Sequence, residues 1–262
     1  MGVSTKGRGW KRVVEKKKII SFGVSVGPYR EFVEQIVALG LGRSSAYVCV
    51  ANVHMVIEAW RDADFAGIVN GADIVTPDGM PLAKALKLLY GIAQNRVAGM
   101  DLMPSLFGEA ELQGLSVFLY GSTDEVLTRV AARMRCDHPA LNIAGIYSPP
   151  FRALAPEEDR EVTNRINVSG ANIVLVALGC PKQETWMVNH KGKINAVMVG
   201  VGGAFPVYAG LQKRAPQWMR RYSLEWFYRL CQEPRRLFRR YLVTNTLFLL
   251  LIGREMVRRR KE

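Results

Sequence analysis

The chain alternates short apolar runs with longer amphipathic stretches between about residue 18 and residue 210. The apolar runs predict strands at residues 19–24, 46–51, 72–75, 116–120, 141–147, 173–178 and 196–201. Between them, apolar positions at helical spacing predict helices over residues 29–39, 56–66, 80–89, 102–112, 125–134 and 156–167. Continuously apolar strands that alternate with helices are typical of a parallel sheet covered on both faces. The pattern therefore predicts an α/β fold.

Both ends of the chain differ from this alternating region in charge. The formal net charge is +13, to which residues 1–18 contribute +6 and residues 213–262 contribute +10, so that residues 19–212 are slightly acidic at −3. We expect a disordered basic arm over residues 1–17, an α/β catalytic domain over 18–210 and a basic helical appendage over 211–262. Two cationic ends indicate a polyanionic partner, either an anionic membrane surface or a nucleic acid.

The appendage interleaves arginine pairs with bulky apolar and aromatic side chains at helical spacing. This composition is typical of a helix in the membrane interface, with its apolar face among acyl chains and its cations on headgroups. The alternative is a helical subdomain with a solvated basic face. No apolar run approaches the ~18 residues that a transmembrane helix needs, so we expect peripheral membrane contact. The expected membrane-binding residues are Arg220, Arg221, Arg235, Arg236, Arg239 and Arg240.

The cysteines and histidines do not suggest a metal site. The four cysteines and three histidines are scattered and show no metal-ligand spacing. No Walker loop occurs, and no Gly-x-Gly-x-x-Gly turn joins a predicted strand to a helix. We therefore expect no metal ion and no cofactor, and free thiols in a reducing compartment.

Polar residues and glycines follow several predicted strands. The carboxyl ends of parallel strands meet at one edge of the sheet, where ligands bind near a reversal of strand order. We therefore expect the residues at these ends to form one site. They are Asn52, Asp78, Gly121-Ser122, Lys182-Gln183-Glu184 and Gly202-Gly203.

The segment Thr76-Pro77-Asp78-Gly79 is the most informative of these turns. Proline presets φ, aspartate bonds to nearby backbone and glycine accepts positive φ, so ordinary turn chemistry accounts for the tetrapeptide on its own. A carboxylate on a tight turn at a strand end is also well placed to act as a base. The tetrapeptide alone favours the structural turn, and the two roles are compatible.

Three further segments offer groups for a phosphate or a sugar. Arg96 could neutralise a phosphate, or it could form an ion pair with Asp101. Lys182 and Gln183 could bind phosphate and sugar at a strand end. The turn at Gly121 could present backbone N–H groups to a diphosphate at a helix N-terminus. Each of these signals is weak alone, because surface ion pairs, helix caps and ordinary turns look similar.

Seven short motifs occur in a fixed order, and together they resemble the WecG/TagA/CpsF glycosyltransferases, glycosyltransferase family 26. The resemblance extends from about residue 20 to residue 240. The motifs are Asn52-Val53-His54, Thr76-Pro77-Asp78-Gly79, Arg96 with Gly99 and Asp101, Gly179-x-Pro181-Lys182-Gln183-Glu184, Gly200-x-Gly202-Gly203-Ala204-Phe205, Arg214-Ala215-Pro216 and Glu225-Trp226-x-x-Arg229-Leu230.

This resemblance implies a Rossmann-like sheet of the GT-E type and an inverting hexosyltransferase that needs no metal. The expected reaction moves a hexose, N-acetylmannosamine type or glucose, from a UDP-sugar to a polyprenyl-diphosphate-linked saccharide in cell-surface or exopolysaccharide synthesis. The expected place is the cytoplasmic face of the bacterial inner membrane, where the basic appendage meets the lipid. A homo-oligomer is left open.

Carried onto this sequence, the resemblance assigns the general base to Asp78 and a place in the same pocket to Asn52. It implies that Arg96 and Gln183 contact the phosphate or the sugar of the donor. The further residues expected at the donor site are Thr76, Asp101, Gly121, Lys182 and Gly202.

Two positions depart from the pattern of the relatives. Many relatives have threonine where this chain has Val50, and many have an acidic residue where it has Pro206. The sequence therefore leaves the identities of donor and acceptor open.

Two other classes of function compete with the glycosyltransferase. A nucleic-acid-binding protein could use its basic ends, with aromatic side chains stacked on bases. The charge is terminal rather than spread over the α/β body, which argues against this class, and we expect no nucleic-acid partner. A small-molecule hydrolase on an α/β sheet is the second alternative, but none of the histidines has a clear catalytic partner.

Overall fold

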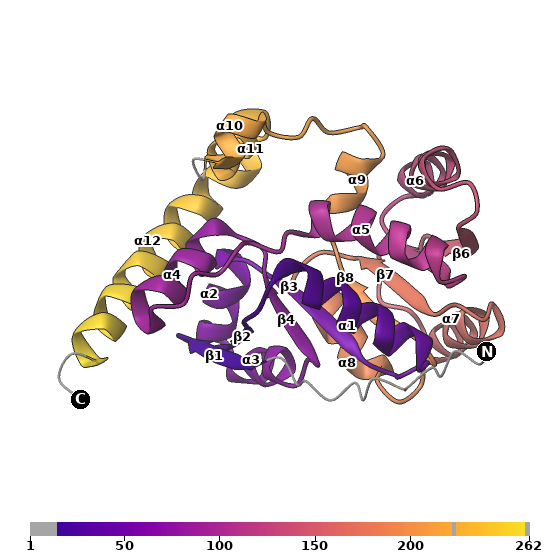
Figure 1. The fold of residues 1–262 in the computed structure, drawn as a ribbon, viewed down its shortest axis with the longest axis horizontal. Helices are drawn as coiled ribbons and strands as arrows, with labels where there is room; N and C mark the ends of the chain where they lie inside the picture. Colours follow the sequence, from indigo (N-terminus) through magenta and orange to yellow (C-terminus); the bar gives the residue numbers. More distant parts are fainter. Residues whose placement is uncertain (1–14, 222–223, 260–262) are drawn as a thin grey trace, which may run out of the picture.

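The computed structural model describes residues 15–221 and 224–259. A six-stranded parallel sheet with the order β4-β3-β8-β7-β5-β6 forms its centre (Figure 1). The predicted α/β, Rossmann-like parallel sheet is confirmed. The strands are β3 (Tyr47–Ala51), β4 (Ile74–Pro77), β5 (Ser116–Gly121), β6 (Asn142–Tyr147), β7 (Ile173–Ala177) and β8 (Val197–Gly200).

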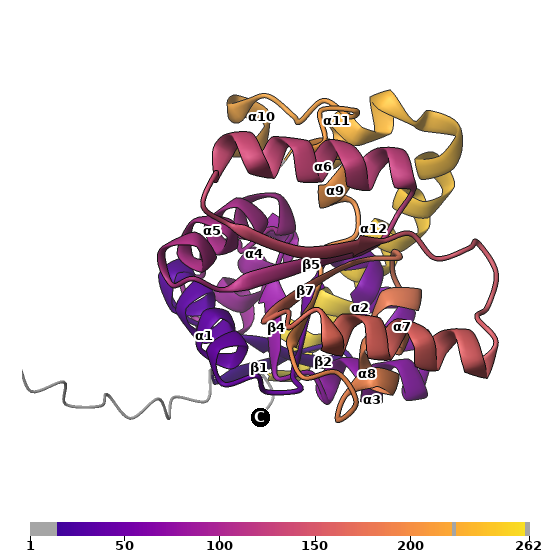
Figure 2. The same ribbon diagram turned by 90° about the vertical axis from the view of Figure 1, so that its right-hand side faces the viewer.

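Helices cover both faces of this sheet, and Figure 2 shows α6 and α7 on opposite sides of β5. Side chains alternate along each strand, so that Val48 and Val50 of β3 enter one core while Tyr47 and Cys49 enter the other. One face packs on α1 (Tyr29–Leu41), α5 (Gly99–Leu112), α6 (Asp124–Asp137) and α9 (Ala204–Tyr208). The other packs on α2 (Val53–Arg61), α3 (Ala63–Asn70), α4 (Met80–Tyr90), α7 (Pro156–Val168) and α8 (Lys182–His190).

The first predicted strand, residues 19–24, is wrong. The structure has instead an antiparallel hairpin of β1 (Lys16–Ile19) and β2 (Phe22–Ser25), which lies outside the parallel sheet. The chain reverses at Ile20, which has a φ of 57°. A β-branched residue seldom adopts this conformation, so the sequence contains no signal for the turn. Residues 1–14 of the predicted basic arm lie outside the described residues.

The predicted helix over residues 56–66 is two helices, α2 and α3. Asp62 has extended backbone angles, which end α2, and its carboxylate accepts hydrogen bonds from the backbone N–H groups of Asp64 and Phe65. This is the geometry of an N-cap. The apolar spacing continues through the break, which is why periodicity alone did not reveal it.

The C-terminal region is helical, as expected, with α10 (Gln217–Arg221), α11 (Glu225–Gln232) and α12 (Pro234–Arg259). Helix α12 lies along α2 and α4 and buries Phe248 and Ile252 in the same core (Figure 1). In the part of the chain that the structure describes, no helix combines the length and the apolar character needed to cross a bilayer.

Gly121 ends β5 where its backbone passes very close to β7. Its φ is +103°, and a Cβ at this position would lie 2.7 Å from the carbonyl carbon and oxygen of Ala177. Glycine is therefore required here both by its backbone angle and by the adjacent strand. The donor-binding role predicted for Gly121 stays a prediction, but the conformation already accounts for the residue.

The substitution Gly121→Ala should lower the free energy of unfolding by about 2–4 kcal/mol, because backbone atoms of β7 must move. Gly114→Ala is the matched control, since Gly114 also has a positive φ, +65°, but open space around it. The control should lose about 1 kcal/mol. Urea unfolding followed by circular dichroism measures both, and equal losses would contradict the role assigned to the contact with Ala177.

Candidate active site

Asp78 and Asn52 lie at neighbouring strand ends. The backbone N–H of Asp78 donates to the carbonyl oxygens of Ala51, at 2.8 Å, and Thr76, at 3.1 Å. These bonds hold the turn after β4 against the end of β3. Asn52 directly follows β3 and caps α2, because its side-chain oxygen accepts from the Met55 N–H at 3.2 Å. The structure therefore brings these two predicted residues together.

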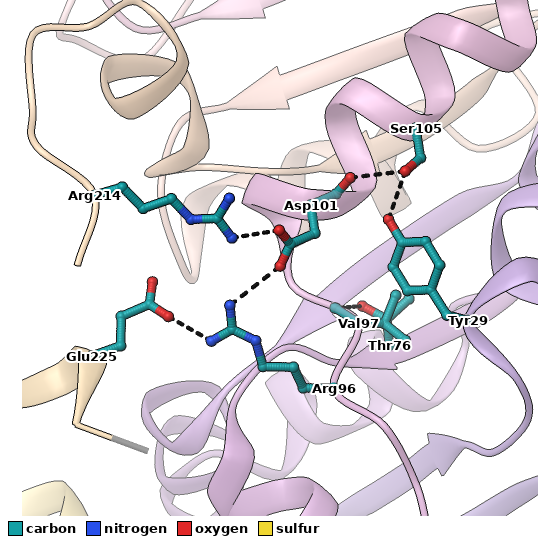
Figure 3. Close-up of polar contacts among 8 residues, drawn as sticks. All are labelled: Tyr29, Thr76, Arg96, Val97, Asp101, Ser105, Arg214 and Glu225. Carbon is teal, nitrogen blue, oxygen red and sulfur yellow. Dashed lines mark hydrogen bonds and ion pairs between the residues drawn. The ribbon is translucent and has the colours of Figure 1, made fainter. Parts of the chain in front are cut away.

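Thr76 fixes the segment that precedes α5. Its hydroxyl group donates to the Val97 carbonyl at 3.1 Å (Figure 3). The Val97 N–H in turn donates to the Pro77 carbonyl at 2.8 Å. The Thr76 side chain is completely buried. In this structure it holds the backbone beside Arg96 and is not on a ligand-accessible surface.

The carboxyl group of Asp78 has a pKa raised to about 6. Burial is the main cause, and the negative charge of Glu225 adds to it. Arg229, Arg96 and a hydrogen bond from the backbone of Gly99 act in the opposite direction. A carboxylate with a pKa close to neutral pH is suited to general base catalysis, because it is ionised at pH 7 and still accepts a proton readily.

A chain of ion pairs runs beside Asp78. Arg96 donates to Glu225 through Nη1 and to Asp101 through Nη2, the latter at 3.2 Å, and Asp101 also accepts from Arg214 (Figure 3). Burial acts to raise the pKa of Asp101, but the hydrogen bonds and charges of the two arginines lower it overall. The chain connects the start of α5 with the segment before α10 and with α11. The alternative that the sequence left open for Arg96, an ion pair with Asp101, is confirmed.

Arg229 belongs to the site and did not appear among the predicted residues. A Cβ on Gly203 would lie 3.1 Å from Nη2 of Arg229, so the guanidinium group lies over the glycine turn after β8. Its charge also acts on Asp78. Among the described residues the guanidinium group has no ion pair. The spacing of Glu225 and Arg229, one helical turn apart, is the signal that could have indicated a shared face.

The buried side chain of Gln183 packs against the glycines that follow β7 and end β8. Its Oε1 accepts from the Gly179 N–H at 3.2 Å, and its Nε2 donates to Oε1 of Glu184 at 2.8 Å. A Cβ on Gly200 or Gly202 would lie 3.0 or 3.2 Å from the Gln183 side chain. The Gln183 side chain is only 4% exposed and both of its polar atoms form hydrogen bonds, so it supports these turns from the interior of the protein. Its predicted donor contact stays a prediction.

Glu184 is completely buried, and its Oε2 has no hydrogen-bond partner among the described residues. Burial raises the pKa of this carboxyl group, against the hydrogen bond from Gln183. Hydrogen bonds from the Glu184 backbone and from the Cys180 thiol also oppose the effect of burial, but the net shift of the pKa is upward.

Within the described residues, Lys182 and Gly202 add no side-chain hydrogen bond to this arrangement. Lys182 is exposed at the start of α8, and Gly202 has a φ of +46° in the turn after β8. Of the predicted membrane-binding residues, Arg220 is half-buried and Arg235, Arg239 and Arg240 are exposed. The side chains of Arg221 and Arg236 lie outside the described residues.

The sequence also contains one Asp-x-Asp segment and one Gly-x-Ser-x-Gly segment, and neither forms a catalytic site in the structure. Asp62-Ala63-Asp64 has the Asp-x-Asp form of carboxylates that hold a metal, but Asp62 caps α3 at the end of α2 away from Asn52. Gly23-Val24-Ser25-Val26-Gly27 has the form of a hydrolase elbow, but Ser25 is completely buried and accepts from the Val75 N–H at 3.0 Å. Within residues 15–221 and 224–259, no group of three or more His, Cys, Asp or Glu side chains could hold a metal ion.

The model of the glycosyl transferase WecG/TagA/CpsF family matches residues 17–262. The chain belongs to this family. It is therefore an enzyme, a hexosyltransferase, and membership decides among the three classes of function that the sequence left open.

Two Bacillus proteins are similar to the chain along most of its length. Both are named N-acetylglucosaminyldiphosphoundecaprenol N-acetyl-beta-D-mannosaminyltransferase. The protein of Bacillus spizizenii (strain W23) is 36% identical over 192 residues, 73% of each chain. That of Bacillus subtilis (strain 168) is 34% identical over 191 residues, 72% of each chain.

The substitution Glu184→Gln should stabilise the protein at neutral pH and remove part of its pH dependence. The pKa of Glu184 is higher in the folded protein than the ordinary value of 4.5, so above pH 4.5 the folded protein holds this proton more tightly than the unfolded chain does. The free energy of unfolding of the wild type therefore falls as pH rises from the unfolded pKa to the folded one. Glutamine keeps the acceptor for Gln183 without a titratable group. Melting temperatures between pH 4 and 8 measure the effect.

The exposed substitution Glu157→Gln controls for the loss of one negative charge. If the difference in melting temperature between Glu184→Gln and wild type does not increase with pH, the pKa of Glu184 is not raised in the folded protein and the prediction is wrong.

Proposed function

We propose that this enzyme transfers a hexose, with inversion, from a UDP-sugar to a polyprenyl-diphosphate-linked saccharide at an anionic membrane surface. The observation on which the proposal chiefly rests is Asp78, a carboxyl group with a pKa of about 6 beside Arg96 and Arg229. The names of the two Bacillus relatives support an N-acetylglucosaminyl-diphospholipid acceptor and N-acetylmannosamine as the hexose. UDP-glucose is the competing donor.

The proposed reaction needs one base. Asp78 takes the proton from the acceptor hydroxyl group as its oxygen attacks the anomeric carbon of the donor. The bond from that carbon to the diphosphate breaks, and UDP leaves with the electron pair. A single attack from the face opposite the diphosphate inverts the anomeric centre.

The proposed reaction also needs cations to stabilise the departing diphosphate. Arg96 and Arg229 are the guanidinium groups next to Asp78, and charge-assisted hydrogen bonds from such groups stabilise developing charge strongly. We assign no metal ion to this step. Asn52 and the backbone of the turns at Gly121 and Gly202 complete the proposed donor site, with Lys182 at its exposed margin.

The substitution Asp78→Asn should lower kcat/KM by at least about 10²-fold, because asparagine cannot accept the proton. For the wild type, kcat/KM should fall as pH drops through about 6, where Asp78 becomes protonated. Both are measured with UDP-N-acetylmannosamine and a synthetic lipid-diphosphate acceptor, with UDP-glucose in parallel. Asp64→Asn, at an exposed position, should leave kcat/KM and the pH profile unchanged.

Retention of more than a tenth of wild-type activity in Asp78→Asn, with an unchanged melting temperature, would exclude Asp78 as the base.

The outer face of α12 supports the membrane part of the proposal. Its buried residues face α2 and α4, whereas Leu242, Leu249 and Leu250 are 59%, 71% and 60% exposed. Exposed arginines stand at both ends of this apolar stretch, at residues 235, 239 and 240 and at residues 254 and 258. A helix of this kind lies in the interface with its leucines among acyl chains and its arginines on headgroups.

The double substitution Leu249→Glu with Leu250→Glu should release the protein from vesicles that contain anionic lipid. These side chains leave the packed face of α12 intact, whereas truncation before residue 213 would also remove the buried Phe248. Flotation with phosphatidylglycerol vesicles measures the bound fraction, which should fall at least about fivefold. Leu112→Glu, at an 82% exposed position of α5, is the control. Equal flotation of all three proteins would exclude this face as the lipid contact.

A further inference from the structure

Both terminal nitrogens of Arg96 are engaged by carboxylates. Nη1 donates to Glu225 and Nη2 donates to Asp101 (Figure 3). The side chain is 16% exposed, so little of the guanidinium group is open to a ligand. These bonds use two of the five guanidinium N–H donors, and the group is largely buried, so a diphosphate gains a paired contact on the side that faces a carboxylate when that carboxylate leaves.

Asp101 is the carboxylate that is held more strongly. It accepts from Arg214 as well as from Arg96, and it lies in the first turn of α5, where the helix dipole favours a negative charge. Its displacement would leave Arg214 without this partner. A diphosphate is therefore expected to displace Asp101 from Arg96 less readily than it displaces Glu225.

Glu225 is held less strongly. Within the described residues its carboxylate pairs with Arg96 alone. It is the first residue of α11, an eight-residue helix in which no residue is fully buried. Movement of Glu225 therefore breaks one ion pair and disturbs little packing.

We propose that Glu225 occupies the anion site of Arg96 until the diphosphate of a nucleotide displaces it, so that nucleotide binding detaches the start of α11 from Arg96. This inference rests on the proposed use of a UDP-sugar. The ligand class is a nucleoside diphosphate, recognised here through its diphosphate. Glu225 is a positioning residue that competes with the nucleotide for Arg96.

The same competition assists product release. The tethered carboxylate has a high effective concentration next to Arg96, so it replaces UDP there after transfer without diffusing from solution. Nucleotide release limits the turnover of many enzymes, and a built-in competitor shortens this step. Loss of the competitor should therefore strengthen UDP binding while it slows turnover.

Calorimetric titration of the full chain with UDP tests the inference through a double-mutant cycle. Glu225→Gln should lower the Kd of UDP about five- to tenfold, which is an ordinary size for coupling between two sites. In the Arg96→Gln background the same substitution should change Kd less than about twofold, because the contested partner is gone. Inorganic pyrophosphate should show the same pattern. If Arg96→Gln does not fold, Arg96→Met, which also removes the charge, replaces it in the cycle.

Glu34→Gln is the matched control, because it also removes the carboxylate of a glutamate–arginine pair, here with Arg30 in α1. It should leave the Kd of UDP unchanged. Unchanged or weaker UDP binding by Glu225→Gln overturns the inference, as does an equal gain in the Arg96→Gln background, which would be a general charge effect. If the wild type binds no UDP, the proposed donor is wrong and this inference falls with it, an outcome distinct from the others.

Discussion

The guanidinium group of Arg96 joins the sheet to the C-terminal helices. The loop before it is fixed to the end of β4 through Thr76 and Val97, and the side chain bridges Asp101 of α5 and Glu225 of α11. Arg96 and Glu225 are only 16% and 15% exposed, so removal of Arg96 would leave Glu225 as a poorly solvated charge, whereas removal of Glu225 leaves Arg96 paired with Asp101. This contact helps to hold the start of α11 over the site, together with the contacts of α11 with α10 and α12.

The formal charges around Asp78 are balanced. The carboxylates of Asp78, Asp101 and Glu225 alternate with the guanidinium groups of Arg96, Arg214 and Arg229. A diphosphate would add negative charge to this group, and displacement of one carboxylate would offset part of it. A site with a net excess of arginine would bind the diphosphate more easily, but it would also lower the pKa of Asp78 and weaken it as a base.

The fold could be predicted because strands of a parallel sheet that is covered on both faces are continuously apolar. The carboxyl ends of such strands meet at one edge of the sheet, so the polar residues that follow the strands were expected to lie together there. Asp78 and Asn52 were found in this way. The hairpin at Ile20 was missed because its turn lacks glycine, and the break at Asp62 because apolar spacing continues through it. The pairing of Arg96 with Glu225 joins residues 129 positions apart, and no local pattern encodes such a contact. The same holds for the support that Gln183 gives to the glycine turns, which depends on its burial.

The turn at Asp78 shows why structural and chemical roles need not compete for one residue. Its backbone N–H donates to the carbonyl oxygens of Ala51 and Thr76, so main-chain atoms close the turn, while the carboxyl group accepts from the backbone of Gly99 outside the turn. The carboxyl group is therefore not needed to form the turn, unlike that of Asp62, which is used entirely as a helix cap. Because the anchor lies in the backbone, the environment of the side chain could be tuned by burial and by Glu225 without loosening the strand end. An aspartate whose carboxylate closed its own turn would have its pKa lowered by those hydrogen bonds and would be a poorer base.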